Sequence, residues 1–195
     1  MAAATNVLNS SAKKDFVQHS PVYTRTAIAF HWFMALLISA GFTLGATMTD
    51  LHMSPRELKL YSYHKWIGIT VLGLVLLRLL WRLTHAAPPD EPMPRWQRIA
   101  AYITHWLLYG LMIATPIVGW LYSSASGYPV VYLKLWQLPD LVSKNKDLAK
   151  VLVQVHGLLA WTLFWVVLLH VAAALKHHFF DRDATLRRML AWQRP

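Results

Sequence analysis

The sequence contains no cysteine, and its acidic residues are scarce: nine Asp and Glu accompany nineteen Lys and Arg. Without cysteine, neither a disulfide nor a metal site with thiolate ligands can form. Charged residues make up only 14% of the chain, whereas 56% of the residues are hydrophobic. This balance argues against an ordinary soluble domain and is typical of a membrane protein.

Four apolar runs, at residues 24–48, 61–83, 99–122 and 152–177, are each long enough to cross a bilayer as a helix. Such a crossing needs about 20 mostly apolar residues. The connections are short and no strand-like alternation of useful length competes, so we predict an all-α transmembrane four-helix bundle with antiparallel neighbours. Residues 1–20 are polar and lack the apolar core of a signal peptide, so we expect an N-terminal tail before a single domain at 21–195.

The positive charges are distributed unevenly between the two sides of this predicted bundle. With both termini on one side, that side holds twelve of the nineteen Lys and Arg residues. The positive-inside rule therefore predicts that both termini are cytoplasmic. Because the charge follows the membrane topology, we do not expect a nucleic-acid partner. The seven cations of the other side are Arg56, Lys59, Lys65, Lys134, Lys144, Lys146 and Lys150.

Four histidines lie inside the apolar runs, where an imidazole is costly unless it is paired or used. They are His31, His64, His156 and His170. The last two are fourteen residues apart, which returns them to nearly the same helix face about 21 Å further along. The predicted topology places His31 at the depth of His170 and His64 at the depth of His156. We therefore predict these two pairs.

Paired imidazoles at two depths could ligate two stacked haems. No Cys-x-x-Cys-His motif is present, so these haems would be non-covalent. Small residues one turn from the histidines, such as Ala35, Gly68, Ala160 and Ala173, would leave room for a porphyrin plane. Small residues also mediate ordinary helix packing in membranes. The alternatives are histidines that hydrogen-bond between helices, and a metal or proton-relay role.

Arg78 follows His64 by fourteen residues and so lies on the same face, at the depth of His31 and His170. Its guanidinium could bind a haem propionate, or it could extend to the cytoplasmic interface, which is the role that we favour for Arg82. Lys65 belongs to an outer face whose seven cations exceed its four acidic residues by three. That excess could attract a small anion, although anchoring lysines in a solvated loop are the commoner explanation.

Three further histidines lie at the cytoplasmic ends of the third and fourth runs. His105 could contact a quinone or a haem propionate, or could form an interfacial hydrogen bond. His177 and His178 lie near the predicted headgroup region, where one of them could donate to a quinone carbonyl. Otherwise both are interfacial residues.

At these positions the chain resembles the bacterial cytochrome b561 family, the small four-helix dihaem proteins of the inner membrane. The matching stretches are Ile28–Trp32, His64–Gly68 with Arg78–Arg82, His105 with Thr115–Gly119, and Leu169–His178. The resemblance covers about residues 20–190. It is weakest in the outer loop, which we expect at 123–150.

The resemblance implies two b-type haems, with His31, His64, His156 and His170 as axial ligands. It also implies a multi-pass protein of the bacterial inner membrane that passes electrons from superoxide to ubiquinone. Superoxide would meet the outer haem near Lys65. Quinone would be reduced near the other haem, with His105, His177 or His178 supplying hydrogen bonds or protons.

A second function stays open at this stage. Related chains serve as cytochrome b membrane anchors that take electrons from a dehydrogenase or hydrogenase partner. The short loops and tails leave little surface for a permanent partner, which favours a stand-alone oxidoreductase. A haem-free structural or transport protein is the third alternative.

Overall fold

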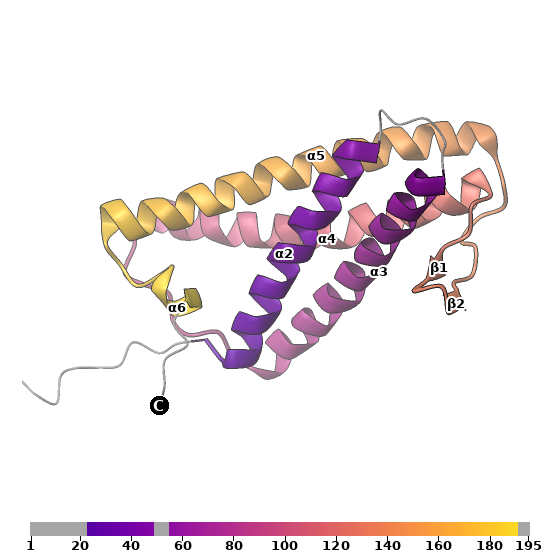
Figure 1. Cartoon of the computed structure of the whole chain (residues 1–195). Coiled ribbons are helices and arrows are strands. Elements are labelled where there is room, and N and C mark those ends of the chain that lie inside the picture. Colours follow the sequence, from indigo (N-terminus) through magenta and orange to yellow (C-terminus); the bar gives the residue numbers. More distant parts are fainter. Residues whose placement is uncertain (1–22, 49–54, 191–195) are drawn as a thin grey trace, which may run out of the picture.

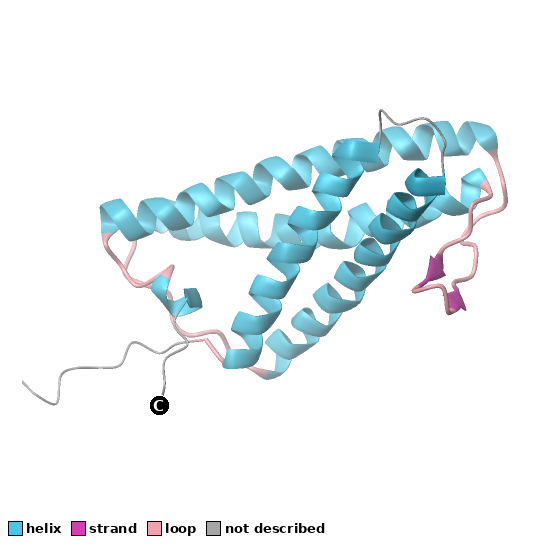
Figure 2. Ribbon diagram, in the orientation of Figure 1, coloured by secondary structure: helices cyan, strands magenta, loops and turns pink. Residues whose placement is uncertain are grey.

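A computed structural model of the chain describes residues 23–48 and 55–190, and four long helices dominate it (Figures 1 and 2). The expected tail at 1–20 lies outside the described residues. The elements are α2 (Arg25–Met48), α3 (Pro55–Thr84), α4 (Arg95–Ser126), β1 (Val131–Tyr132), β2 (Trp136–Gln137), α5 (Lys146–Lys176), the π-helical turn η1 (His177–Asp181) and α6 (Arg187–Leu190).

All four long helices are long and apolar enough to span a membrane. Large apolar side chains cover their outer surfaces; Leu36 on α2 and Leu158 on α5 are 66% and 68% exposed. A surface of this kind is costly in water but favourable against lipid chains, which are as apolar as leucine. The prediction of four helices that are long and apolar enough to span a membrane is therefore confirmed.

The four helices pack as two pairs, α2 against α3 and α4 against α5, and α3 also contacts α4. In Figure 1 the α2–α3 pair is inclined to the α4–α5 pair. One buried cluster includes Met34, Val75, Met112 and Leu163, a residue from each long helix. Leu163 lies midway between His156 and His170 in the sequence, so this cluster separates the two histidine levels.

Helix α2 matches its predicted apolar run to within one residue, whereas the other three long helices extend beyond theirs. Helix α3 begins six residues before its run, and α5 begins at Lys146, where the side chain of Asn145 accepts hydrogen bonds from the amides of Asp147 and Leu148. Helix α4 continues to Ser126 and ends at Gly127, whose φ of 76° is left-handed. The outer connection between helices is therefore 127–145, shorter than the loop predicted at 123–150.

This connection contains a small hairpin that the sequence pattern did not predict. Strands β1 and β2 are two residues each, with Tyr132 opposite Trp136. The hairpin is fastened to α3, because Trp66 Nε1 donates to the carbonyl of Val131 at 2.7 Å and the Thr70 and Tyr132 hydroxyls lie 2.9 Å apart. Strands this short leave too few alternating residues to recognise.

At the opposite end of the molecule, the chain after α5 folds back onto the beginning of α2. Trp32 Nε1 donates to the carbonyl of Met189 at 2.8 Å. Buried Arg188 donates to the carbonyl of Pro89 at 2.8 Å and pairs with Glu91 at 3.2 Å. These bonds join α2, the α3–α4 connection and the α6 segment.

Candidate functional site

The four histidines of the apolar runs face one another in two pairs. The ring centroids of His31 (α2) and His170 (α5) are 6.1 Å apart. Those of His64 (α3) and His156 (α5) are 6.0 Å apart. We call the first the inner pair and the second the outer pair, after the orientation that the charge pattern predicts. Each pair joins helices from the two halves of the bundle.

The separations match what a shared iron would need. Two imidazoles bound to one metal through bonds of about 2 Å place their ring centroids roughly 6 Å apart. Both pairs therefore have the spacing of axial haem ligands without any movement of the helices. Fourteen residues separate the two levels along α5, which corresponds to about 21 Å.

The hydrogen bonds of the outer pair leave Nε2 of each ring free to bind a metal. The Nδ1 of His64 lies 2.9 Å from the carbonyl oxygen of Gly41, and the Nδ1 of His156 lies 3.0 Å from that of Thr115. A carbonyl oxygen only accepts, so Nδ1 carries the proton in both rings. The lone pair is then on Nε2, where an iron ligand needs it.

The inner pair has a different neighbour. Arg78 Nη2 lies 3.4 Å from Nδ1 of His31, and the guanidinium carbon is 5.8 Å from the ring centroid of Tyr109. A guanidinium only donates, so this contact draws the His31 proton to Nε2. At 3.4 Å the hydrogen bond is long and weak. Arg78 must therefore leave His31 before that ring can bind a metal through Nε2.

His105 lies beside the inner pair. Its ring centroid is 5.4 Å from that of His170, and the two planes are inclined by 66°. Helix α4 thus brings a third imidazole to this level. A group bound between His31 and His170 would lie next to His105.

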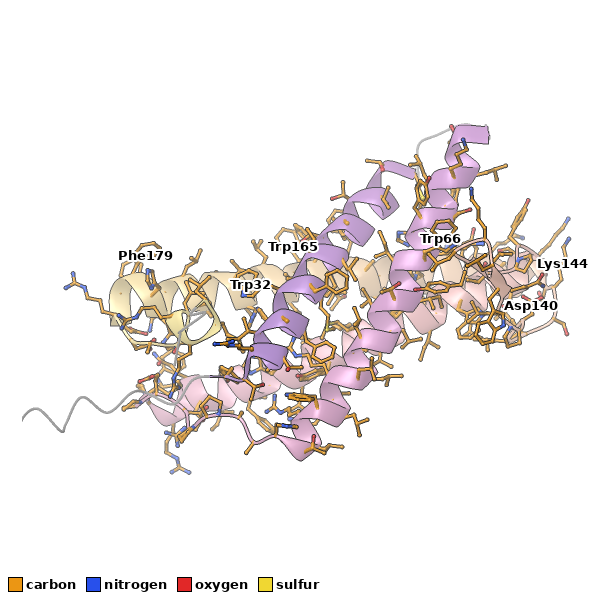
Figure 3. The ribbon with its side chains drawn as sticks, turned by 60° about the horizontal axis from the view of Figure 1, so that its bottom comes forward. Trp32, Trp66, Asp140, Lys144, Trp165 and Phe179 are labelled. Carbon is orange, nitrogen blue, oxygen red and sulfur yellow. The ribbon has the colours of Figure 1, made fainter. Side chains whose placement is uncertain are left out.

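Lys65 is held at the other end of the bundle. Its ammonium donates to the carbonyl of Tyr128 at 3.0 Å, at the beginning of the outer connection. Asp140 and Lys144 belong to the same connection, close to the ends of α4 and α5 (Figure 3). Lys150 forms an exposed ion pair with Asp147 at 3.0 Å, so these two charges of the predicted cationic face offset each other.

His177 and His178 have separate environments in η1. Nδ1 of His177 donates to the Asp183 carboxylate at 2.6 Å and lies 3.1 Å from Asp181. Burial tends to raise the pKa of Asp183, but hydrogen bonds from Thr185 and His177 outweigh it and hold that pKa below its usual value. The His178 ring contacts Phe179, with centroids 4.9 Å apart. In Figure 3, Phe179 lies at the end of the molecule opposite Lys144.

Gly68, one of the small residues predicted to leave room beside the histidines, lies against a neighbouring helix. A Cβ on Gly68 would contact Pro116 of α4 at 3.8 Å, so Gly68 serves the contact between α3 and α4. The residues missed by the sequence analysis are Gly45 and Gly119, which face the outer rings from neighbouring helices. Gly45 follows Gly41 by one turn, a spacing of small residues that can signal close helix approach.

Four apolar helices with paired imidazoles at two levels have the architecture of membrane cytochromes. The model of the family described as prokaryotic cytochrome b561 matches residues 22–192. The chain belongs to this family, whose members are membrane proteins that carry b-type haem and transfer electrons.

Named proteins of two bacteria are similar to most of the chain. It is 34% identical over 178 residues to Cytochrome b561 homolog 2 of Escherichia coli (strain K12), which covers 86% of this chain and 90% of the relative. It is 33% identical over 182 residues to the Probable superoxide oxidase CybB of Yersinia pestis, with 88% and 97% covered.

Proposed function

We propose that this chain carries two b-type haems and transfers electrons from superoxide at its outer face to ubiquinone near its inner pair. His64 and His156 would hold one haem, and His31 and His170 would hold the other. The observation that carries this proposal is the pair of ring separations, 6.1 Å and 6.0 Å, on one bundle. The similarity to a probable superoxide oxidase supports the choice of donor.

The proposed orientation places an antiparallel bundle in the bacterial inner membrane with both termini in the cytoplasm. The uneven distribution of Lys and Arg supports it. The outer pair then lies near the external surface, beside the 127–145 connection. The inner pair, with His105 beside it, lies toward the cytoplasm, where protons for quinone reduction are available.

A haem held between two imidazoles would supply one-electron transfer. The protein's part is to hold these groups and to bind the substrates at opposite ends. Two superoxide anions each lose one electron and become dioxygen. Ubiquinone takes up both electrons and two protons and becomes ubiquinol. Lys65 attracts the anion at the outer end, and Arg78, once released from His31, would pair with a haem propionate at the inner end.

His105 and the histidines of η1 are the candidates for handling quinone and protons. His105 can donate a hydrogen bond to a quinone carbonyl close to the inner pair. His177 is already bonded to Asp183, so it can pass a proton while remaining oriented. His178 lies next to it in the chain, contacts Phe179, and is the third candidate for a hydrogen bond to quinone.

The activity is tested by stopped-flow mixing of superoxide with the purified protein and ubiquinone. We expect the intact protein to consume superoxide faster than heat-denatured protein and to form one ubiquinol per two superoxide anions. Consumption no faster than in the denatured control would reject the proposed donor. A dehydrogenase that co-purifies in stoichiometric amounts and reduces the haems would support the membrane-anchor alternative instead.

The ligand assignment is tested by haem quantification and reduced-minus-oxidised spectra. We expect two haems per chain, and we expect His64→Ala and His156→Ala each to remove the outer haem while sparing much of the inner one. The reason is that each variant leaves the other pair and its helices unchanged. Equal loss of both haems in both variants, or loss of neither, would contradict the pairing.

A further inference from the structure

The two outer imidazoles are held by the same local pattern, although they come from different helices. His64 on α3 donates to the carbonyl of Gly41 on α2. His156 on α5 donates to the carbonyl of Thr115 on α4. In each case the acceptor belongs to the preceding helix of the chain, and it fixes the ring through Nδ1.

A glycine lies one turn beyond each acceptor and faces the same ring. A Cβ on Gly45 would be 3.2 Å from Cε1 of His64. On Gly119 it would be 2.9 Å from Cε1 and 3.1 Å from Nδ1 of His156. Residues four apart share one face of a helix, so acceptor and glycine form a single contact surface for the ring. We call Gly41/Gly45 and Thr115/Gly119 the carbonyl–glycine pairs.

This contact is not a general property of glycine in the bundle. A Cβ on Gly73 of α3 or on Gly110 of α4 would meet no atom within 4 Å among its neighbours. An added Cβ on Gly41 would meet Ile67 Cγ2 at 3.0 Å, whereas at Gly45 and Gly119 the neighbour is an imidazole that hydrogen-bonds to the carbonyl one turn earlier. The coincidence of both features on α2 and again on α4 indicates a shared role.

We propose that the carbonyl–glycine pairs position the outer ligands, with Gly45 and Gly119 setting the ring orientation at which Nδ1 reaches its carbonyl. This inference rests on the proposed haem ligation. A hydrogen bond from Nδ1 to an acceptor raises the basicity of the ligating nitrogen and fixes the ring plane. A metal-bound ring cannot retreat from an added methyl group, because the iron holds Nε2. The ring must then tilt, lengthen its hydrogen bond or lose the metal.

The experiment compares Gly119→Ala and Gly45→Ala with Gly110→Ala as the matched control on α4. Haem content, the electron paramagnetic resonance signals of the ferric haems and their reduction potentials are measured. The signal lost in His156→Ala identifies the outer haem. We expect Gly110→Ala to match the unaltered protein and Gly119→Ala to fall from two haems to one, with the inner signal retained. Gly45→Ala, whose added methyl is less crowded, is expected to keep two haems but to shift the outer signal and its potential.

The outcomes separate this inference from the proposal on which it rests. Fewer than two haems in the unaltered protein would reject the dihaem assignment itself. Two haems in that protein, with Gly119→Ala indistinguishable from Gly110→Ala, would overturn only the role of the glycines. If Gly119→Ala loses both haems through misfolding, Gly45→Ala decides: an unchanged outer signal and potential in that variant would overturn the inference.

Discussion

Arg78 is a cation at the level of the inner pair, inside a helix whose surroundings are apolar. Its guanidinium lies between the rings of His31 and Tyr109 rather than at the end of α3. The alternative of a side chain that extends to the interface therefore does not describe Arg78 in this structure. A positive charge at this position would favour the reduced form of a haem bound by the inner pair.

We expect Arg78→Gln to lower the reduction potential of the proposed inner haem, because the reduced form loses a nearby cation. A tenfold change in the reduction equilibrium, ~59 mV for one electron, is the size to look for. Potentiometric titration of haem absorbance measures the change. Arg82→Gln is the matched control, since Arg82 is one turn further along α3 and exposed. Equal shifts in both variants would argue against a specific role for Arg78.

The histidine pairs could be anticipated because residue type, helical spacing and membrane depth all act on the side chain. His156 and His170 share a face by spacing alone, and depth selects their partners. The acceptors of the outer rings could not be anticipated in this way. They are backbone carbonyls, which every residue carries, and only the packing of α4 against α5 selects Thr115 for His156.

At the scale of elements, the end of α5 is bound by the Asp183 carboxylate, in addition to the ion pair of Lys176 with Asp181. Asp183 accepts from the His177 ring at 2.6 Å and from the Thr185 amide at 2.8 Å. These bonds connect η1 to the segment that leads into α6. Arg182, between them, has a left-handed φ of 55° and so turns the chain back.

We expect Asp183→Asn to destabilise this segment by about 1–2 kcal/mol, since it weakens hydrogen bonds to a charged acceptor. The lowered pKa of Asp183 means that the stabilisation is fully present above the unfolded-state pKa of 3.8 and is lost as pH falls through the folded-state pKa. The stability difference between Asp183→Asn and the unaltered protein should thus persist from pH 7 down to about pH 5. Thermal unfolding in detergent at several pH values measures it. Asp181→Asn should cost less, because its carboxylate is more exposed.

The four helices followed from hydropathy because membrane solvation acts on long apolar runs. Their ends did not follow, because backbone hydrogen bonding continues into charged turns that a hydropathy criterion excludes. The first turn of α5 contains Lys146 and Asp147 and is stabilised by Asn145, a capping contact outside the apolar run. The β1–β2 hairpin depends on its contacts with Trp66 and Thr70, which are distant in sequence.

For the whole molecule, the distribution of cations predicts which side each connection occupies. We expect a reporter that fluoresces only in the cytoplasm to be bright when fused after Pro195. The same reporter inserted at Leu135, in the outer connection, should be dark, because that site is 88% exposed and lies on the side with fewer cations. Whole-cell fluorescence normalised to protein amount provides the measurement. The reverse pattern would place the inner pair outside.

The lengths of α4 and α5 decide how the protein fits a bilayer of given thickness. Helix α4 has 32 residues and α5 has 31, so they measure about 48 Å and 46 Å, whereas the hydrocarbon layer is about 30 Å thick. Such helices must tilt or protrude into the headgroups. Tilting of α5 brings its two histidine levels closer along the membrane normal than the ~21 Å of an upright helix. Lipid thickness thereby becomes a determinant of the transmembrane distance that each electron covers.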